Sequence, residues 1–188
     1  MPIMPAASLT SGVTIATCFA PEENCNAFAV DAVDGAGREI LVSAYSLTSG
    51  SGILEALVRA AQRGVDVRLI ADRTTPCERR GGLDPLARAG ASVWIDRGVR
   101  IAHAKTMVID GKVTLTGSMN WSGGAARNSE NLNLVFSPEV AETYAGHWRQ
   151  RLAASVPFAG RDDWCRQRTA GNPCEHVWAA LPARARRA

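Results

Sequence analysis

The sequence predicts a layered α/β/α fold around a mixed, mostly parallel central sheet. Near-continuous apolar runs alternate with stretches of helical periodicity, a pattern typical of α/β proteins with covered strands. With 188 residues, of which 46% are hydrophobic, the chain is long enough to bury one core and is neither disordered nor fibrous. The formal net charge of +3 permits a polyanionic partner but does not identify one.

The first elements form a predicted βαβ unit. Residues 13–19 (VTIATCF) have the β-branched alternation of a strand. We expect a helix to open at Pro21 and to stop at Gly35. The apolar run 39–46 (EILVSAYS) then predicts a strand covered on both faces.

The alternation continues along the chain. Residues 51–64 place apolar side chains at helical spacing between a serine cap and a glycine stop. A hairpin between residues 101 and 122 makes the sheet mixed. The remaining predicted elements are a strand at 65–72, a polar loop at 73–82, a short helix within 83–90, strands at 91–96 and 131–136, and a helix from Pro138 to about Arg151.

The pattern indicates one domain over residues 13–155, without a repeat or a second domain. Residues 1–12 precede it as a segment that we expect to be flexible. Residues 156–188 form a tail rich in Arg, Pro and Gly. We expect this tail to be mostly loop and to pack onto the domain through Trp164 and Trp178.

The five cysteines leave two interpretations open. Disulfides Cys18–Cys25 and Cys165–Cys174, with a free thiol at Cys77, would suit an oxidising compartment, whereas five reduced cysteines would suit the cytosol. We prefer the first. No apolar run reaches the roughly 18 residues of a membrane-spanning helix, and the N-terminus lacks a secretion-signal pattern. We therefore expect a soluble protein, periplasmic or secreted if a signal peptide has been removed and otherwise cytoplasmic.

The hairpin at residues 101–122 (IAHAKTMVIDGKVTLTGSMNWS) carries the polar groups that suggest chemistry. Asp110-Gly111 between β-branched runs predicts a two-residue type I′ turn, with Ile109 opposite Lys112. Side chains alternate along a strand, so this register places four polar groups on one face: His103, Lys105, Ser118 and Asn120. An imidazole, an ammonium, a hydroxyl and a carboxamide together make an anion site beside a nucleophile.

Each of these residues also has a structural interpretation. A strand histidine is usually a satisfied packing residue, a lysine at a strand end is usually solvated, and Asp-Gly is usually only a turn. Their convergence in one register favours the functional interpretation.

The spacing His103-x-Lys105, four residues, Asp110, six residues, Gly117-Ser118-x-Asn120 resembles the HKD signature of the phospholipase D superfamily. The segments CFAPE, AYSLTS, ALVRAAQRGVDVRLIAD, RNSENLNLVF and HWRQR follow the order seen in short bacterial endonucleases called Nuc, over roughly residues 13–151. The resemblance implies a phospholipase D-like catalytic domain and phosphodiesterase activity.

The resemblance also implies a homodimer. Superfamily enzymes work with two HKD motifs, and this chain has one, because the surroundings of His147 and His176 lack the Lys, the Asp and the Gly-Ser. A twofold axis through the active site would let two His103 side chains face one phosphate.

The implied mechanism is a two-step phosphoryl transfer. One His103 forms a phosphohistidine, and the second acts first as acid and then as base. Lys105 and Asn120 would hold the nonbridging oxygens, with support from Ser118. Glu130 matches the carboxylate that orients the imidazole; the alternative is a solvated glutamate at a strand entry.

The other candidates are weaker. Asp110 belongs to the catalytic motif, but its place in the turn favours a structural hydrogen-bond acceptor. We expect His147 to pack in the core beside Trp148. Three side chains of the tail are of metal-ligating types: Cys165, Cys174 and His176. Their irregular spacing fits a disulfide and a surface histidine better than a metal site. No cluster has the ligand spacing of a two-metal nuclease, so we expect neither metal nor cofactor.

The motif defines a reaction and leaves the substrate open. Arg97, Arg100 and Arg127 flank it in predicted loops, and dimerisation would double them around one cleft, which suits nucleic acid. The alternative is that they are ordinary solvated arginines. No basic amphipathic helix with aromatic anchors is present, so we expect no stable membrane association. A sequence-nonspecific endonuclease acting on DNA, or on RNA, is preferred over a phospholipid hydrolase; an inactive nucleic-acid-binding module is disfavoured by the intact motif.

Overall fold

The computed structural model describes residues 12–78 and 80–166, with side chains as far as Trp164. Its eight-stranded sheet has the order β1-β7-β6-β5-β2-β3-β4-β8. The strands are β1 (Thr14–Ala20), β2 (Glu39–Ala44), β3 (Asp66–Asp72), β4 (Ser92–Asp96), β5 (Lys105–Ile109), β6 (Val113–Gly117), β7 (Glu130–Phe136) and β8 (Ser155–Pro157). The helices are α1 (Cys25–Asp34), α2 (Ile53–Gln62), η1 (Thr75–Cys77), α3 (Leu83–Arg88), η2 (Ala125–Arg127), α4 (Pro138–Ala153) and α5 (Arg161–Arg166).

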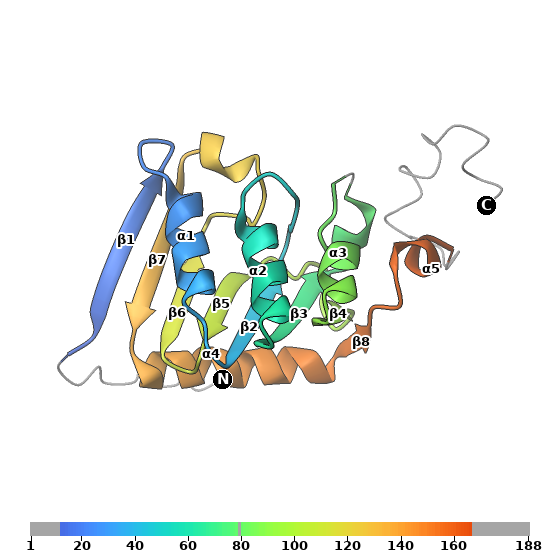
Figure 1. Cartoon of the computed structure of the whole chain (residues 1–188). Coiled ribbons are helices and arrows are strands. Elements are labelled where there is room, and N and C mark those ends of the chain that lie inside the picture. Colours follow the sequence, from blue (N-terminus) through green and yellow to red (C-terminus); the bar gives the residue numbers. More distant parts are fainter. Residues whose placement is uncertain (1–11, 79, 167–188) are drawn as a thin grey trace.

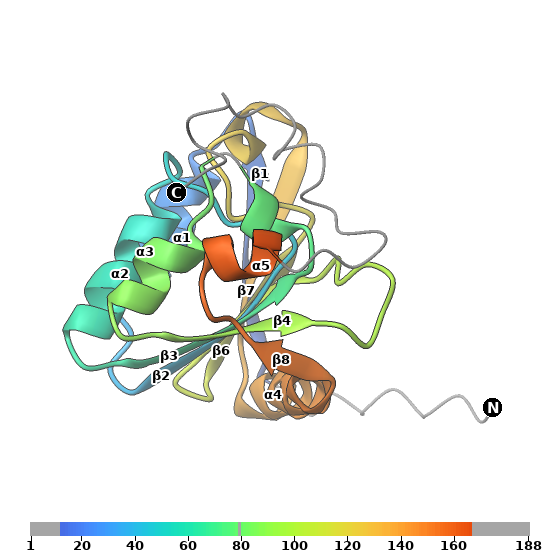
Figure 2. The same cartoon turned by 90° about the vertical axis from the view of Figure 1, so that its right-hand side faces the viewer.

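The predicted α/β/α layering is confirmed. Helices α1, α2 and α3 lie side by side on one face of the sheet, and α4 crosses the opposite face (Figures 1 and 2). The larger core lies on the α1–α3 side. A smaller core under α4 consists of Leu41, Ile70, Val108, Ala141, Ala145 and Trp148.

The expectation of a mostly parallel sheet is wrong. Only β2–β3 and β3–β4 pair in parallel, whereas the other five of the seven pairs among the described strands are antiparallel. The reason is that the meander β5-β6-β7 lies against β2 and reverses direction at each turn. The meander separates β1 from β2 in the sheet. The predicted βαβ unit therefore joins two strands that are not neighbours.

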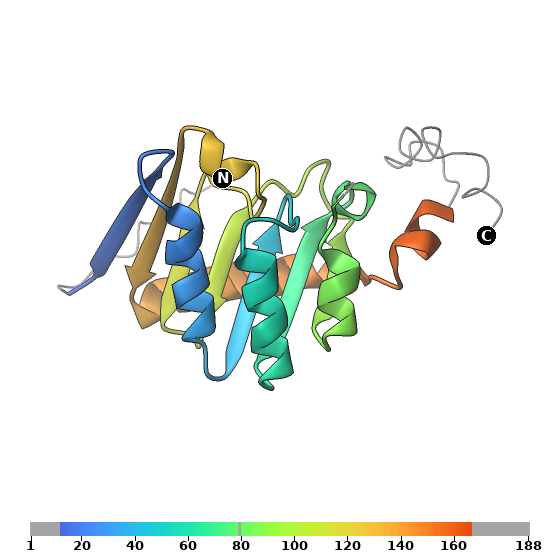
Figure 3. The same cartoon turned by 45° about the horizontal axis from the view of Figure 1, so that its top comes forward.

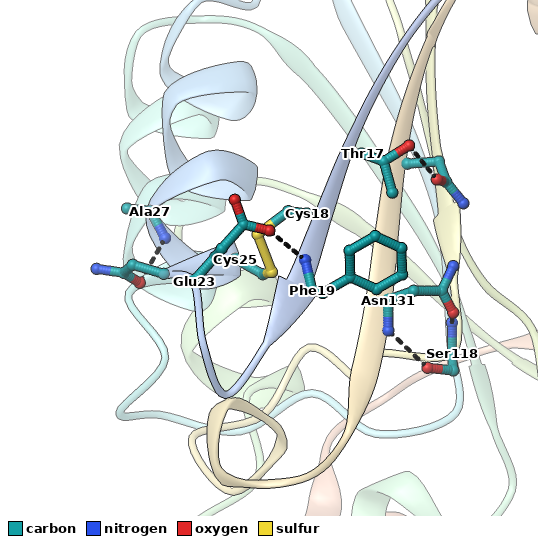
Figure 4. Close-up of a disulfide and its surroundings, with 10 residues drawn as sticks. Thr17, Cys18, Phe19, Glu23, Cys25, Ala27, Ser118 and Asn131 are labelled. Carbon is teal, nitrogen blue, oxygen red and sulfur yellow. Dashed lines mark hydrogen bonds between the residues drawn. A yellow bond between two sulfur atoms is a disulfide. The ribbon is translucent and has the colours of Figure 1, made fainter.

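The first helix begins later than predicted, at Cys25 instead of Pro21. The chain first makes a turn, and the Asn24 side chain then caps the helix by accepting from Ala27 N–H at 3.1 Å. The predicted disulfide Cys18–Cys25 is present and joins the end of β1 to the start of α1 (Figure 4).

The other cysteine predictions have different outcomes. Cys77 is disulfide-bonded, so the expectation of a free thiol is wrong. The predicted pair Cys165–Cys174 lies outside the described side chains.

The tail packs against the domain as predicted where it is described. Strand β8 pairs with β4 across the predicted boundary at residue 155, and Trp164 is buried in the larger core. The predicted contact of Trp178 and the expected flexibility of residues 1–11 lie outside the described residues. Within 12–78 and 80–166, no helix combines the length and apolar composition needed to span a membrane.

Candidate active site

The hairpin has the predicted turn but not the predicted register. Asp110 and Gly111 have φ angles of 54° and 66°, and Lys112 N–H donates to the Ile109 carbonyl at 3.0 Å. However, Ile109 pairs with Val113, so Lys112 is an extra loop residue and the predicted pairing is wrong by one position.

Burial explains the register. A shift of one residue moves every side chain of a strand to the opposite face. In the observed register Met107 lies opposite Leu115, and both are fully buried in the larger core. The predicted register would have placed Thr114 opposite Met107 instead. Simple alternation therefore does not position Ser118 and Asn120, which lie beyond the end of β6.

His103 and Lys105 lie together, as expected. Lys105 begins β5, beside the C-terminal end of β2, at the edge of the sheet where the loops after β2, β3 and β4 gather (Figure 3). Its Nζ lies 2.9 Å from Nδ1 and 3.0 Å from Nε2 of His103 and donates to the His103 carbonyl at 2.8 Å. A charged lysine has no lone pair, so it can donate only to a ring nitrogen without a proton. The contact fixes the lysine against the imidazole, and the tautomer of His103 determines which ring nitrogen accepts.

Tyr45 completes the surroundings of this pair. Its ring centroid lies 4.4 Å from that of His103, and Lys105 Nζ lies 5.0 Å from the Tyr45 ring. Lys105 is 6% exposed while His103 is exposed. Burial lowers the pKa of Lys105, and the nearby negative charge of Glu130 opposes that change. The arrangement is an accessible nucleophile held by a buried ammonium.

Ser118 and Glu130 form a second pair. Ser118 Oγ donates to Glu130 Oε2 at 2.5 Å. It also accepts from Asn131 N–H at 3.0 Å (Figure 4). The other carboxylate oxygen of Glu130 accepts from Asn128 at 3.2 Å. The expected orienting contact of Glu130 with an imidazole is not seen among the described residues of the single chain, where its two oxygens contact Ser118 and Asn128.

Asn120 lies between two fully buried anchors, Met119 and Trp121. Trp121 Nε1 donates to the Ser43 carbonyl at 3.1 Å, which fixes this segment against β2. The side-chain oxygen of Asn120 is buried and has no partner in the described part of the chain. This oxygen is a hydrogen-bond acceptor, so only the amide N–H groups of Asn120 can donate to a bound anion.

Asp110 lies at the opposite end of β5 from His103. Its carboxylate accepts from the backbone N–H groups of Gly37, Arg38 and Glu39 at 2.9, 2.8 and 3.0 Å. Burial alone would raise the pKa of Asp110, but these hydrogen bonds and the Arg38 charge hold it below its usual range. The HKD aspartate thus contacts the β2 entry and not the other motif residues.

The sequence interpretation missed Asp72, the last residue of β3. Asp72 is 2% exposed, and its Oδ2 accepts from Ala102 N–H at 2.6 Å, one residue before His103. Its Oδ1 accepts from the backbone and hydroxyl of Thr74 at 2.9 and 2.6 Å. A polar residue at the C-terminal end of a parallel strand was the available signal, since ligand sites gather at that edge.

The predicted arginines are exposed. Arg97 and Arg100 lie in the loop that leads to His103, and Arg127 lies on η2. The guanidinium of Arg97 lies 5.3 Å from the ring of Trp164. His147 is exposed on α4, so its expected place in the core is wrong; it is Trp148 that packs inward.

The described part of the chain contains no group of three or more His, Cys, Asp and Glu side chains arranged to hold a metal ion. The predicted metal alternative at Cys165, Cys174 and His176 lies outside it.

Comparisons with known proteins agree with this geometry. Residues 30–152 match the family described as "Cardiolipin synthase, PLD-like domain". The chain is 37% identical over 142 residues to a protein named Phospholipase D from Rickettsia felis, which covers 75% of this chain and 70% of that protein. It is 31% identical over 125 residues to a protein named Mitochondrial cardiolipin hydrolase from Xenopus tropicalis, covering 64% and 58%.

Solved structures show the same fold. Nuc from Salmonella typhimurium, described as a phospholipase D family member, superimposes with a TM-score of 0.74 at 29% identity, over 78% of this chain and 99% of Nuc. NucT from Helicobacter pylori gives a TM-score of 0.72 over 78% and 100%, and its 22% identity supports the fold alone. An exposed His103 held by a buried Lys105, in a chain with these relatives, means that this protein belongs to the phospholipase D superfamily and is a phosphodiesterase.

Proposed function

We propose that this phosphodiesterase is a metal-independent, sequence-nonspecific endonuclease that hydrolyses DNA, and RNA as a second substrate. The observation that carries the proposal is the His103–Lys105 contact: an exposed imidazole with a buried ammonium beside its ring nitrogens. Such a pair supplies both the nucleophile and a positive charge for a phosphodiester, without a metal ion in either role.

The proposed reaction has two steps. His103 attacks the phosphorus, the bond to the leaving oxygen breaks, and a phosphohistidine forms. The partner subunit's His103 is protonated at that stage and gives its proton to the leaving oxygen. It then removes a proton from a water molecule, which attacks the phosphorus and breaks the phosphorus–nitrogen bond. The enzyme returns to its starting protonation state.

The other site residues stabilise charge in this scheme. The Lys105 ammonium and the amide N–H groups of Asn120 are donors that suit the nonbridging oxygens, on which negative charge grows in the transition state. Ser118 holds Glu130 in place. The negative charge of Glu130 lies close enough to act on Lys105, and we retain its proposed orienting role toward the catalytic imidazole.

The single HKD motif supports a homodimer. One chain provides one nucleophile, whereas the two-step scheme needs a second imidazole on the opposite side of the phosphate. His103 and Ser118 are exposed in the single chain, which leaves them accessible to a substrate and to a second copy of the chain.

Nucleic acid is favoured by the charges that flank His103. Arg97, Arg100 and Arg127 are exposed in the segments before and after the motif, and a dimer would double them around one cleft, which suits a nucleic-acid backbone without base readout. The likeness to Nuc points the same way. A phospholipid hydrolase remains the second candidate because of the relatives named Phospholipase D and Mitochondrial cardiolipin hydrolase. The Cys18–Cys25 disulfide supports an oxidising compartment, periplasmic or extracellular, as the site of action.

The test is a parallel cleavage assay of the purified chain on DNA, RNA and phospholipid vesicles, each with and without EDTA. We expect DNA to be nicked and degraded equally well in EDTA, and the His103→Ala variant to be inactive. Loss of DNA cleavage on adding chelator would refute the metal-free chemistry, and hydrolysis of phospholipid alone would refute the nuclease assignment.

A further inference from the structure

A cavity of about 210 Å³ opens beside His103, between α4 and the loop that precedes β5. Its walls are largely apolar and include Ile70, Val99 and Ile101. Val99 and Ile101 are 39% and 47% exposed, which is unusual for aliphatic side chains next to a polar catalytic group. His147 and Arg151 of α4 provide the polar part of the wall, and His103 itself lines the cavity.

The cavity is close to electrically neutral. The Arg151 guanidinium donates from Nε and from Nη2 to the two carboxylate oxygens of Asp96, at 2.8 and 2.7 Å. Asp96 is 2% exposed, so the pair is fixed and its charges compensate each other. His147 makes no hydrogen bond or ion pair with another residue in the described part of the chain, and its ring nitrogens are available to a ligand. The site therefore suits a neutral group with polar edges and not a second phosphate.

The position of His103 restricts what can enter. For in-line attack the scissile phosphorus must lie about 3 to 3.5 Å from the imidazole nitrogen. A cavity that shares His103 as a wall is then next to the group esterified to that phosphate. Pockets for drug-sized ligands measure roughly 300 to 1,000 Å³, so this smaller cavity has room for a single ring system and not for the acyl chains of a phospholipid.

We propose that this cavity binds one unstacked nucleobase of the strand being cut, next to the scissile phosphate. The inference rests on the proposed nuclease function and extends it. Val99 and Ile101 contact the faces of the base, while His147 and Arg151 hydrogen-bond to its edge. Many bases fit, because every base has an apolar face and polar edges, which agrees with cleavage without sequence preference. A base in a duplex is paired and stacked and must first leave the stack, so single-stranded DNA is cut faster than duplex DNA.

The test uses the full chain and a single-stranded oligodeoxynucleotide with one abasic tetrahydrofuran residue, with cleavage mapped at every linkage. Because each subunit of the proposed dimer carries one such cavity beside the shared site, we expect cutting to fall by about fivefold or more at the bonds that flank the abasic residue. The remaining bonds of the same strand are the internal reference. Equal cutting at all bonds would overturn the inference.

Two variants test whether the difference between the intact and the abasic strand arises at the cavity. In His147→Ala, the difference between the intact and the abasic strand should shrink, because part of the contact with the base is already lost. Arg149→Ala is the matched control: Arg149 is exposed on the same helix, pairs with Glu142 and does not line the cavity. Equal discrimination in His147→Ala and wild type would count against the cavity. A protein that cuts no oligonucleotide at all, and hydrolyses phospholipid instead, would refute the nuclease function and is readily distinguished from these results.

Discussion

Replacement of Asp110 separates a structural role of the HKD aspartate from a chemical one. Its carboxylate accepts three hydrogen bonds from the backbone N–H groups of residues 37–39. Hydrogen bonds to charged groups contribute about 1.5 to 3 kcal/mol, and partial exposure of this turn reduces that to about 1 kcal/mol each. Asp110→Ala also places alanine at φ 54°, which costs up to about 1 kcal/mol more. We therefore expect the free energy of unfolding to fall by about 3 to 4 kcal/mol.

The assay is urea unfolding at pH 7, combined with initial rates of DNA cleavage at a temperature where every variant is folded. Asp110→Gly is the matched control, since glycine adopts positive φ freely and therefore isolates the loss of the hydrogen bonds. We expect both variants to be less stable, with Asp110→Gly the more stable of the two. The kcat of the folded protein should stay within about twofold of wild type, because the carboxylate lies at the far end of β5 from His103.

The pH dependence provides a second check. The folded pKa of Asp110 lies below its unfolded value, so its contribution to stability is complete above about pH 4 and is lost as the pH falls through the folded pKa. The stability difference between wild type and Asp110→Ala should accordingly narrow in acid. A variant with wild-type stability whose kcat is about a hundredfold lower would refute the structural role.

Three further predictions concern other parts of the molecule. Asp72→Asn should lower the kcat for DNA about tenfold with a smaller change in KM, because it loosens the loop one residue before His103; an unchanged kcat in the folded variant would contradict this. Replacing Cys18 and Cys25 by alanine should lower the free energy of unfolding by about 2.5 kcal/mol, from the loop entropy of a short disulfide, as measured by urea unfolding; equal stability would show that the cross-link adds nothing. Sedimentation should give a dimer, and His103→Ala should abolish turnover without altering association; a monomer that cuts at full rate would exclude the shared site.

Local sequence signals predicted the helices and strands and the pairing of His103 with Lys105 in the site. The apolar runs and helical periodicities located strands and helices, and the spacing of His103 and Lys105 two residues apart was enough to place them together. The Asp-Gly signal identified the turn but not the extra residue Lys112, because the register is determined by burial of Leu115 against Met107.

Long-range contacts were not accessible from these patterns. The sheet order depends on where the β5-β6-β7 meander docks, and nothing in the individual strands specifies that neighbour. Asp72 reaches Ala102 across 30 positions of sequence, and Glu130 is paired with Ser118 by the return of β7 alongside β6. Such pairs become visible only when the topology is known.

The covalent step on His103 can be observed directly. The chain is mixed in EDTA with a short end-labelled DNA, quenched within a single turnover, digested under alkaline conditions and mapped by mass spectrometry. We predict an alkali-stable, acid-labile phosphoramidate on the peptide that contains His103, absent from His103→Ala. Continued DNA cleavage with no label on that peptide, or with the label on another residue, would contradict the phosphohistidine mechanism.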